Sequence, residues 1–443
     1  MNLAVAPRWP GGPRRAPPRV LAGAATLGAA LAAGALLGVL SVSDDLVALA
    51  VAGLVAVAGL VAIDPLLIAV AAFPSTLLLQ RTGSGAVGSS LSVADLVIVL
   101  AAVVVIPQVR WERAPALRRA LLPALAYEAI ILTTVLAHPN VHDSLEWLHR
   151  LEMVAGALIL GWAVGASGRA KQAVTAFLLG CIVLSVLTFE HAFALGFQPA
   201  QWGLYQKNYL GAVLWMAAVT AHLNPSWVGL PPRFARVAKY VCAAGILAAQ
   251  AKQDIIALVV VVLLAAFLDP RVRRRSRILL AAAVPLLTAG YFMLVAELSR
   301  PGKLNTVTER TGALSADFHV WFLSPVFGQG MRWFYLPQFA GYAQPPNILA
   351  ETLTDTGLVG LVAILILLVG SARVFLRLPR AVGTIALILL AGRVVEAIFD
   401  VYWVSPLTTL PWMVAGLALG AWDAGLARAP ALGPAGRPEH AVT

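Results

Sequence analysis

Charged side chains are scarce in this sequence. Only 12% of its 443 residues are Asp, Glu, Lys or Arg, whereas soluble domains carry about twice that fraction. Hydrophobic residues make up 60% of the chain, and the mean hydropathy is +0.84. No stretch of about 100 residues is polar enough to form a separate soluble domain. The composition therefore predicts a protein embedded in lipid.

The usual nucleotide and metal motifs are missing. The sequence has no Gly-rich loop ending in Lys-Ser or Lys-Thr, no His-Glu-x-x-His and no Cys-x-x-Cys. Its two cysteines, Cys181 and Cys242, fall in separate apolar runs, where a small thiol packs like any other small side chain. These absences argue against ATP-driven pumping, zinc-dependent hydrolysis and a disulfide framework, and we expect no cofactor.

The net charge of +11 does not indicate nucleic acid as a partner. The basic residues lie at the ends of apolar runs, not on a patch interleaved with aromatic residues. Assigning alternate connections to opposite sides puts 23 of the 32 Lys and Arg residues on the side of the N-terminus and 9 on the other. Because basic residues concentrate in cytoplasmic loops, this distribution predicts a multi-pass inner (cytoplasmic) membrane protein with both termini in the cytoplasm.

Apolar runs recur along nearly the whole chain. With about 17 to 25 apolar residues per span, about fourteen runs begin near Val20, Leu46, Pro65, Val93, Leu121, Leu151, Ala173, Tyr209, Val237, Ile255, Ile278, Thr356, Val382 and Thr408. The predicted fold is all-α: a polytopic membrane protein of about 12–14 transmembrane helices. We expect a cytoplasmic Pro/Arg-rich tail (1–19), one membrane domain (20–426) and a disordered C-terminal tail (427–443).

The longest polar interruption, residues 297–351, is predicted to be a large extracytoplasmic loop. It contains charges, Trp and Tyr residues, and turn signals such as Pro345-Pro346. Residues 313–323 are predicted to form an interfacial helix with Leu314, Phe318 and Trp321 on one apolar face and Asp317 on the other side.

Three cations stand at predicted outer ends of helices, where positive charge is disfavoured. Lys207 precedes Asn208, Lys252 precedes Gln253 and Asp254, and Arg310 follows Glu309. One interpretation is that they converge on an anionic headgroup such as a lipid diphosphate. The other is that each extends separately to the membrane interface.

Two other polar sets also allow two interpretations. Arg393 and Glu396 lie three residues apart on one face of a predicted span, where they either neutralise each other or bind substrate. Near another outside loop, either ordinary loop residues or a metal site is possible, and we assign no metal ligand. The residues concerned are His138, His142, Asp143, Glu146 and His149.

Four stretches follow one another in a distinctive order. They are Gln206-Lys-Asn-Tyr-Leu-Gly211, Gln250-Ala-Lys-Gln253, Thr308-Glu-Arg310 with Trp321, Pro325 and Phe327-Gly-Gln-Gly330, and Pro345-Pro-Asn-Ile-Leu-Ala-Glu351 leading to Thr356-Gly-Leu-Val-Gly-Leu361. Together they resemble the O-antigen ligase and polymerase family of membrane proteins, which transfer a polyprenyl-diphosphate-linked glycan to an acceptor outside the cytoplasmic membrane.

The resemblance implies a C-type membrane glycosyltransferase-like arrangement, with a cavity roofed by the large loop. The implied partners are a polyprenyl-diphosphate-linked glycan donor, a saccharide or glycolipid acceptor, and membrane lipid, with no metal or nucleotide. The implied substrate-binding residues are Lys207, Asn208, Lys252, Arg310 and Asn347. Asn347 has a second interpretation, the N-cap of the following helix.

Two positions depart from the family pattern. Lys252 stands at the family's arginine, which keeps the charge but loses the bidentate guanidinium. Pro346 stands at the family's histidine and has no side-chain group that exchanges a proton. If the chain is a transferase, another base must serve, and the candidates are Glu351, then His319 and Asp317. A non-catalytic binding protein or a transporter of lipid-linked sugars is the alternative.

The loop glycines receive a structural interpretation. Gly328 and Gly330 are expected to form the turn that follows the loop helix. Gly357 and Gly360 are expected to permit close packing between helices. We assign none of the four a chemical role.

Overall fold

The computed structural model describes residues 59, 64–78, 92–199, 205–268, 274, 281, 288, 306–405 and 407–427. Over this part of the chain the regular structure is helical, without a β-strand. The α-helices are α3 (Leu66–Ser75), α5 (Val93–Val105), α6 (Pro115–Ala137), α7 (Val141–Leu151), α8 (Ala157–Ala166), α9 (Ala170–Ala194), α10 (Lys207–Leu223), α11 (Pro232–Ala249), α12 (Lys252–Leu268), α15 (Thr306–Leu323), α16 (Ile348–Leu376), α17 (Arg380–Ala397) and α18 (Thr409–Asp423).

Within the described residues, 4 helices are long and apolar enough to cross a membrane: α6, α9, α16 and the continuous helix Val141–Ala166. The last consists of α7, a π-helical segment (Glu152–Gly156) and α8. The prediction of an all-α membrane protein is therefore confirmed at this level. The expected spans near Val20, Leu46 and Ile278, the tail 1–19 and residues 428–443 lie outside the described residues, and helices occupy the other expected positions.

Helix starts differ from the expected ones where local capping decides them. The helix expected near Leu121 begins at Pro115, because proline suits the first turn and Asp423 accepts hydrogen bonds from the Ala116 and Leu117 N–H groups. The helix expected near Thr356 begins at Ile348, where Asn347 is the N-cap. Caps set these boundaries, and hydropathy does not detect them.

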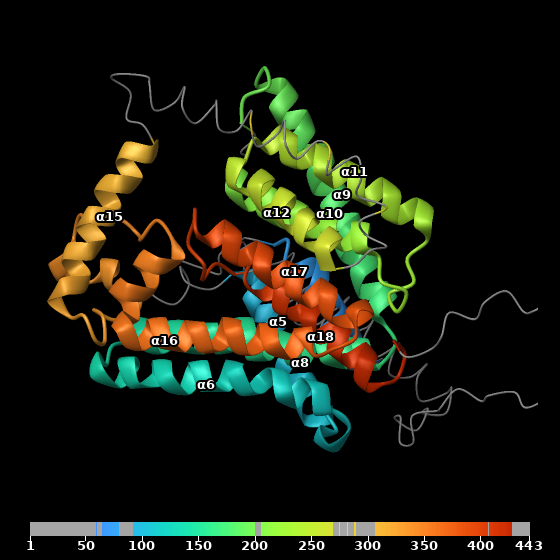
Figure 1. Cartoon of the computed structure of the whole chain (residues 1–443), viewed down its shortest axis with the longest axis horizontal. Coiled ribbons are helices and arrows are strands. Elements are labelled where there is room, and N and C mark those ends of the chain that lie inside the picture. The colour runs from blue at the N-terminus through green and yellow to red at the C-terminus, as the bar shows by residue number, and fades with distance from the viewer. Residues whose placement is uncertain are drawn as a thin grey trace, which may run out of the picture. The chain divides into compact units, whose positions relative to one another are not determined.

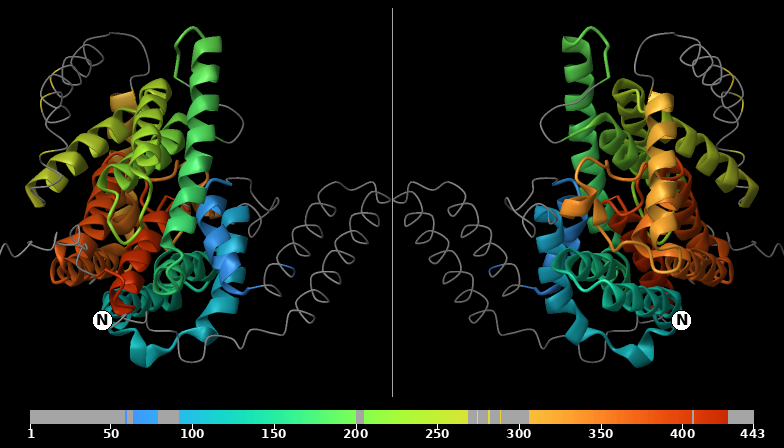
Figure 2. Two further views of the ribbon diagram at one scale, coloured as in Figure 1. Left: turned by 90° about the vertical axis from the view of Figure 1, so that its right-hand side faces the viewer. Right: turned by 90° about the vertical axis from the view of Figure 1, so that its left-hand side faces the viewer.

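The chain divides into two compact units, Met1–Ile68 and Ala69–Thr443, and every candidate site residue lies in the second. Within it, α9, α10 and α11 pack against one another (Figure 2). Helix α12 packs against α10 and α17. Helices α6 and α16 lie side by side (Figure 1).

Helices α8 and α18 pack backbone against backbone through glycines. A Cβ added at Gly161 would lie 1.9 Å from the Met413 carbonyl oxygen, and one at Gly416 would lie 2.3 Å from that of Leu158. Each glycine belongs to a Gly-x-x-x-Gly pair, the spacing that brings two helices together in membranes.

Helix α16 is broken at Gly357, whose φ of 64° and ψ of −155° are not helical. The loop supplies the missing hydrogen-bond partners. Gln329 and Gly330 N–H donate to the carbonyls of Thr354 (2.7 Å) and Asp355 (3.0 Å). The N–H groups of the residues after the break, 358 and 359, donate to the carbonyls of residues 325 and 326 at 3.0 and 3.1 Å. The hydrogen-bonding groups of the irregular backbone are thereby satisfied inside the protein.

The structure corrects the interpretation of these glycines. Gly357 allows the break, and a Cβ there would lie 2.4 Å from the Val326 carbonyl oxygen. Gly328 and Gly330 form turns as expected, with φ of 71° and 95°. Gly328 also touches the broken region, because an added Cβ would lie 2.4 Å from Asp355 C, whereas a Cβ at Gly330 would lie 2.6 Å from Asp143 Oδ2 on α7. Gly360 faces Thr356 of its own helix.

The loop helix α15 is longer than expected, and its polar residue lies inward. Asp317 is only 4% exposed and lines a small crevice with Ala350 and Thr354 of α16, whereas Phe318 is 42% exposed. Asp317 and Phe318 therefore differ in burial as the predicted two-sided helix requires, and the side that bears Asp317 faces the protein. Val320, one turn on and 0% exposed, shares the buried face.

Candidate functional site

Three consecutive residues after α17, Asp400–Tyr402, contact three helices that carry predicted site residues: α10, α12 and α16. The Asp400 carboxylate oxygen Oδ2 accepts hydrogen bonds from Asn208 Nδ2 at 3.0 Å and from Gln253 Nε2 at 2.8 Å. Asn208 is the second residue of α10, and Gln253 is the second residue of α12. One carboxylate therefore connects the first turns of two helices.

Lys207 and Lys252 are the first residues of these helices, and both are exposed. The helices also touch directly, because a Cβ added at Gly211 would lie 2.3 Å from Asp254 Oδ2 and 2.6 Å from the Ala251 Cβ. Two cationic side chains and two helix N-termini thus occur where α10 and α12 meet. Helix N-termini favour anions through their free N–H groups and dipoles.

Arg393 and Glu396 support this segment from α17. Both are 1% exposed, and their charged groups lie 2.9 Å apart. Arg393 also donates to the Val401 carbonyl at 2.7 Å and to that of Tyr402, while Trp215 Nε1 donates to Glu396 at 3.3 Å. These contacts favour the structural interpretation, in which the pair positions residues 400–402.

The predicted base Glu351 contacts the same segment. It is 5% exposed, and its Oε2 accepts a hydrogen bond from Tyr402 N–H at 2.9 Å. Asn347, four residues earlier, accepts hydrogen bonds at Oδ1 from the N–H groups of residues 349 and 350, at 3.1 and 2.9 Å. Its capping interpretation is confirmed, and a substrate role stays a prediction.

Other predicted residues lie on α15. Burial raises the pKa of the Asp317 carboxyl to about 6, while His319 is exposed. The side chain of Arg310 lies outside the described part, although its backbone belongs to α15. Lys207 and Lys252 begin two helices that contact each other, and the expected convergence of the three cations on one anion stays a prediction.

A buried ionic network lies beside the break in α16 and was missed in the sequence. Arg150 pairs with Asp355 at 2.7 Å and with Glu146 at 3.3 Å, and Nη1 donates to the Tyr127 hydroxyl at 3.3 Å. Its guanidinium carbon lies 4.7 Å from the centre of the Trp403 ring. Asp355 is adjacent to the residues of the break, so the network stabilises the irregular backbone.

The loop after α15 also contributes residues to this network. Arg332, which follows the Gly328–Gly330 turns, pairs with Glu146 at 2.9 Å. The Glu146 carboxylate holds the pKa of the Arg332 guanidinium above its ordinary value. Met331 N–H donates to Asp143, which is 1% exposed.

Much of the segment 138–149 belongs to α7, and one face of that helix is buried in the protein. Asp143, Glu146, His149 and Arg150 are 1–6% exposed. Their spacing of three and four residues was a readable signal of one helix face. His142 stacks on Tyr335 with ring centroids 5.8 Å apart. A group of potential metal ligands within the described residues comprises Asp95, His149 and Glu152, not the three histidines.

Comparison with known proteins assigns no family. The sequence matches no model of a known protein family, and no curated protein matches it. A functional assignment therefore depends on the residues and contacts described above.

Proposed function

We propose that this protein transfers a glycan from a polyprenyl-diphosphate donor to a saccharide or lipid acceptor at the extracytoplasmic face of the inner membrane, in cell-surface polysaccharide assembly. We further propose about 12–14 transmembrane helices, with both termini in the cytoplasm. The observation that carries the proposal is the Asp400–Tyr402 segment. It contacts Asn208 of α10, Gln253 of α12 and Glu351 of α16.

The donor's diphosphate is proposed to bind where α10 and α12 begin. In the reaction an acceptor hydroxyl forms a bond to the anomeric carbon of the glycan while the bond from that carbon to the diphosphate oxygen breaks. Negative charge develops on the departing diphosphate, and Lys207, Lys252 and the helix N-termini stabilise it. Arg310 is proposed as a further cation from the loop.

The acceptor hydroxyl also loses a proton, and Glu351 is the first candidate to take it. Tyr402 N–H holds one of its oxygens and orients the carboxylate. His319 and Asp317 on α15 are the other candidates, since Pro346 cannot exchange a proton.

One observation favours a non-catalytic binder or transporter of lipid-linked sugars. Glu351 is 5% exposed and already accepts a hydrogen bond, which limits its access to an acceptor. Such a protein would bind the same donor through the lysines without releasing polyprenyl diphosphate.

The test is turnover by the purified protein in lipid nanodiscs, with labelled lipid-linked glycan and acceptor. We expect Lys207→Ala and Lys252→Ala to lower polyprenyl diphosphate release at least about tenfold, and Glu351→Gln to lower it about 100-fold or more. Lys171→Ala is the matched control: it removes an exposed lysine from the first turn of α9, on the predicted cytoplasmic side. All variants must retain the wild-type helical content and monodispersity.

Two results would decide against transfer. Donor binding that requires Lys252, without any release by the folded wild type across donors of different glycan, would identify a binder or transporter. Release unaffected by both lysine variants would refute the proposed diphosphate site.

A further inference from the structure

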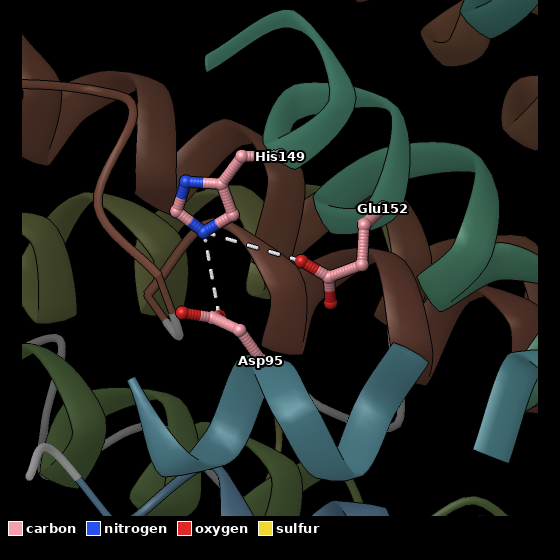
Figure 3. A group of neighbouring side chains, drawn as sticks. All are labelled: Asp95, His149 and Glu152. Carbon is pink, nitrogen blue, oxygen red and sulfur yellow. Dashed lines mark ion pairs between the residues drawn. The ribbon is translucent and has the colours of Figure 1, made fainter. Parts of the chain in front are cut away.

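Asp95 of α5 and two residues of the Val141–Ala166 helix, His149 and Glu152, lie together (Figure 3). Aspartate, histidine and glutamate are common metal ligands in proteins. His149 Nε2 lies 3.4 Å from Asp95 Oδ1 and 4.0 Å from Glu152 Oε2. One donor atom from each residue lies within 4.8 Å of the others. None of the three was assigned a role in glycan transfer, and this inference does not rest on that proposal.

The backbone around the group is built to hold it. Asp95 belongs to a capping box with Ser92 at the start of α5, and its Oδ1 accepts a hydrogen bond from the Ser405 hydroxyl. Glu152 is the first residue of the π-helical segment that follows α7. Single π-turns inside α-helices occur frequently at functional sites.

The surroundings of Glu152 also indicate that a cation binds here. Its side chain is 9% exposed, and neither carboxylate oxygen has a hydrogen-bond partner. Figure 3 shows one of these oxygens directed at His149, on the side where Asp95 also points. A buried carboxylate without hydrogen bonds is costly unless a cation neutralises it.

The charges of the group fit a divalent cation. With a neutral imidazole, Asp95 and Glu152 contribute two negative charges, which one divalent ion cancels. The opposite ring nitrogen, His149 Nδ1, faces Glu146 Oε2 at 3.7 Å. A carboxylate behind a metal-bound histidine sets the ring's tautomer and orientation.

We propose that Asp95, His149 and Glu152 bind one divalent transition-metal ion of the Zn²⁺ class, through one nitrogen and two oxygens. Bonds of about 2.1 Å in tetrahedral geometry separate neighbouring donors by roughly 3.4 Å, which matches the His149–Asp95 distance. The ion cross-links α5 to the Val141–Ala166 helix. Ser405, in the chain before α18, orients Asp95 through its hydrogen bond. The role of the ion is to hold these elements together, beside the ionic network centred on Arg150.

The competing explanation is a shared proton, in which a protonated His149 pairs with the two carboxylates and no metal binds. The two explanations predict different outcomes for a neutral, equally sized replacement of Glu152. If metal binding is lost in the variant, Glu152 is a ligand. If the three side chains instead share a proton, neither the wild type nor the variant binds metal.

The experiment uses the full-length chain in detergent, purified without a polyhistidine tag and treated with a chelator. Binding of Zn²⁺ is followed by calorimetry, and Co²⁺ is used as a spectroscopic probe because its visible absorption reports bound nitrogen and oxygen ligands. We expect one ion per chain and a higher melting temperature with Zn²⁺. Glu152→Gln should weaken binding at least about tenfold, and His149→Gln should abolish the Co²⁺ spectrum.

Glu128→Gln is the matched control. Glu128 is a 3% exposed carboxylate on α6, and both of its oxygens also lack a hydrogen-bond partner. We expect this variant to bind Zn²⁺ like the wild type. The proposal is overturned if the folded wild type binds neither Zn²⁺ nor Co²⁺ when the metal is present at about 100 μM. That concentration is about 100 times a dissociation constant of 1 μM, so even a weak site would be filled. The proposal is also overturned if Glu152→Gln binds as tightly as Glu128→Gln.

Discussion

At the scale of single residues, the buried Arg150 is paired with carboxylates. Arg150 is 2% exposed and holds two carboxylates, Asp355 and Glu146, at 2.7 and 3.3 Å. Breaking such a pair leaves a charge in a dry interior, which costs far more than the pair contributes when intact. The network therefore makes residues from α7 and α16 depend on each other.

We predict that Arg150→Gln destabilises the protein by about 3–5 kcal/mol, because Asp355 loses its cation. Thermal unfolding in detergent, followed by circular dichroism, measures the effect. Arg332→Gln is the comparison, since its side chain is 18% exposed and water can partly replace it at Glu146. Equal melting temperatures for Arg150→Gln and the wild type would show that Asp355 does not need Arg150.

At the scale of elements, α16 is held in a broken conformation by the loop that packs on it. Four backbone hydrogen bonds join residues 325–330 to residues 354–359. Asp355, two residues before the break, pairs with Arg150, while Glu351 one turn earlier contacts Tyr402. Loop and helix therefore form one unit around the proposed catalytic residue.

We predict that Gly357→Ala destabilises the protein by about 1–3 kcal/mol. Its φ of 64° is strained for alanine, and the Cβ would lie 2.4 Å from the Val326 carbonyl oxygen. The control is Gly312→Ala on α15, where a Cβ meets nothing within 4 Å, so helix propensity favours alanine. Identical melting curves for the two variants would argue against the break.

The contact between α15 and α16 should depend on pH through Asp317. Its pKa is about 6 because burial disfavours the carboxylate, compared with about 3.9 in an unfolded chain. The contact is therefore strongest below about pH 4 and weakens as the pH rises through 6. Hydrogen exchange of α15 amides, corrected for intrinsic rates, should be slower at pH 5 than at pH 7.

The control for this pH effect is Asp317→Asn, which cannot ionise. In this variant we expect the corrected exchange rates to be equal at the two pH values. A pH dependence that persists in Asp317→Asn would assign the effect to another group.

At the scale of the whole molecule, orientation determines which face can meet the acceptor. The excess of Lys and Arg on one side predicts that the loop bearing α15 lies outside and that the end of α16 lies in the cytoplasm. Helix α16 has the length and composition to connect these sides. The lysines that begin α10 and α12 are predicted to share the outer side.

This orientation can be tested with single cysteines at exposed positions. We predict that a membrane-impermeant maleimide labels His319→Cys in intact cells but labels Arg377→Cys only after the membrane is permeabilised. The native residues Cys181 and Cys242 are 0% exposed and should stay unlabelled in both conditions. The reverse pattern would invert the topology and place the proposed site in the cytoplasm.

The sequence by itself determined the class of the protein and the approximate positions of its helices. Hydropathy is a sum over neighbouring residues, so it is readable without knowledge of tertiary contacts. The Arg393–Glu396 pair and the Asn347 cap are also local, since their partners lie within a few residues. For the same reason, their structural interpretations were already available from spacing alone.

Only the tertiary structure decided which distant groups meet. Asp400 lies 192 residues from Asn208 and 147 from Gln253 in the chain, and no local pattern indicates that one carboxylate joins them. Arg150 and Asp355 are 205 residues apart. The break at Gly357 was likewise missed, because it depends on a partner surface that local periodicity does not contain. Long-range pairing of buried polar groups follows from packing, and packing is a property of the folded chain.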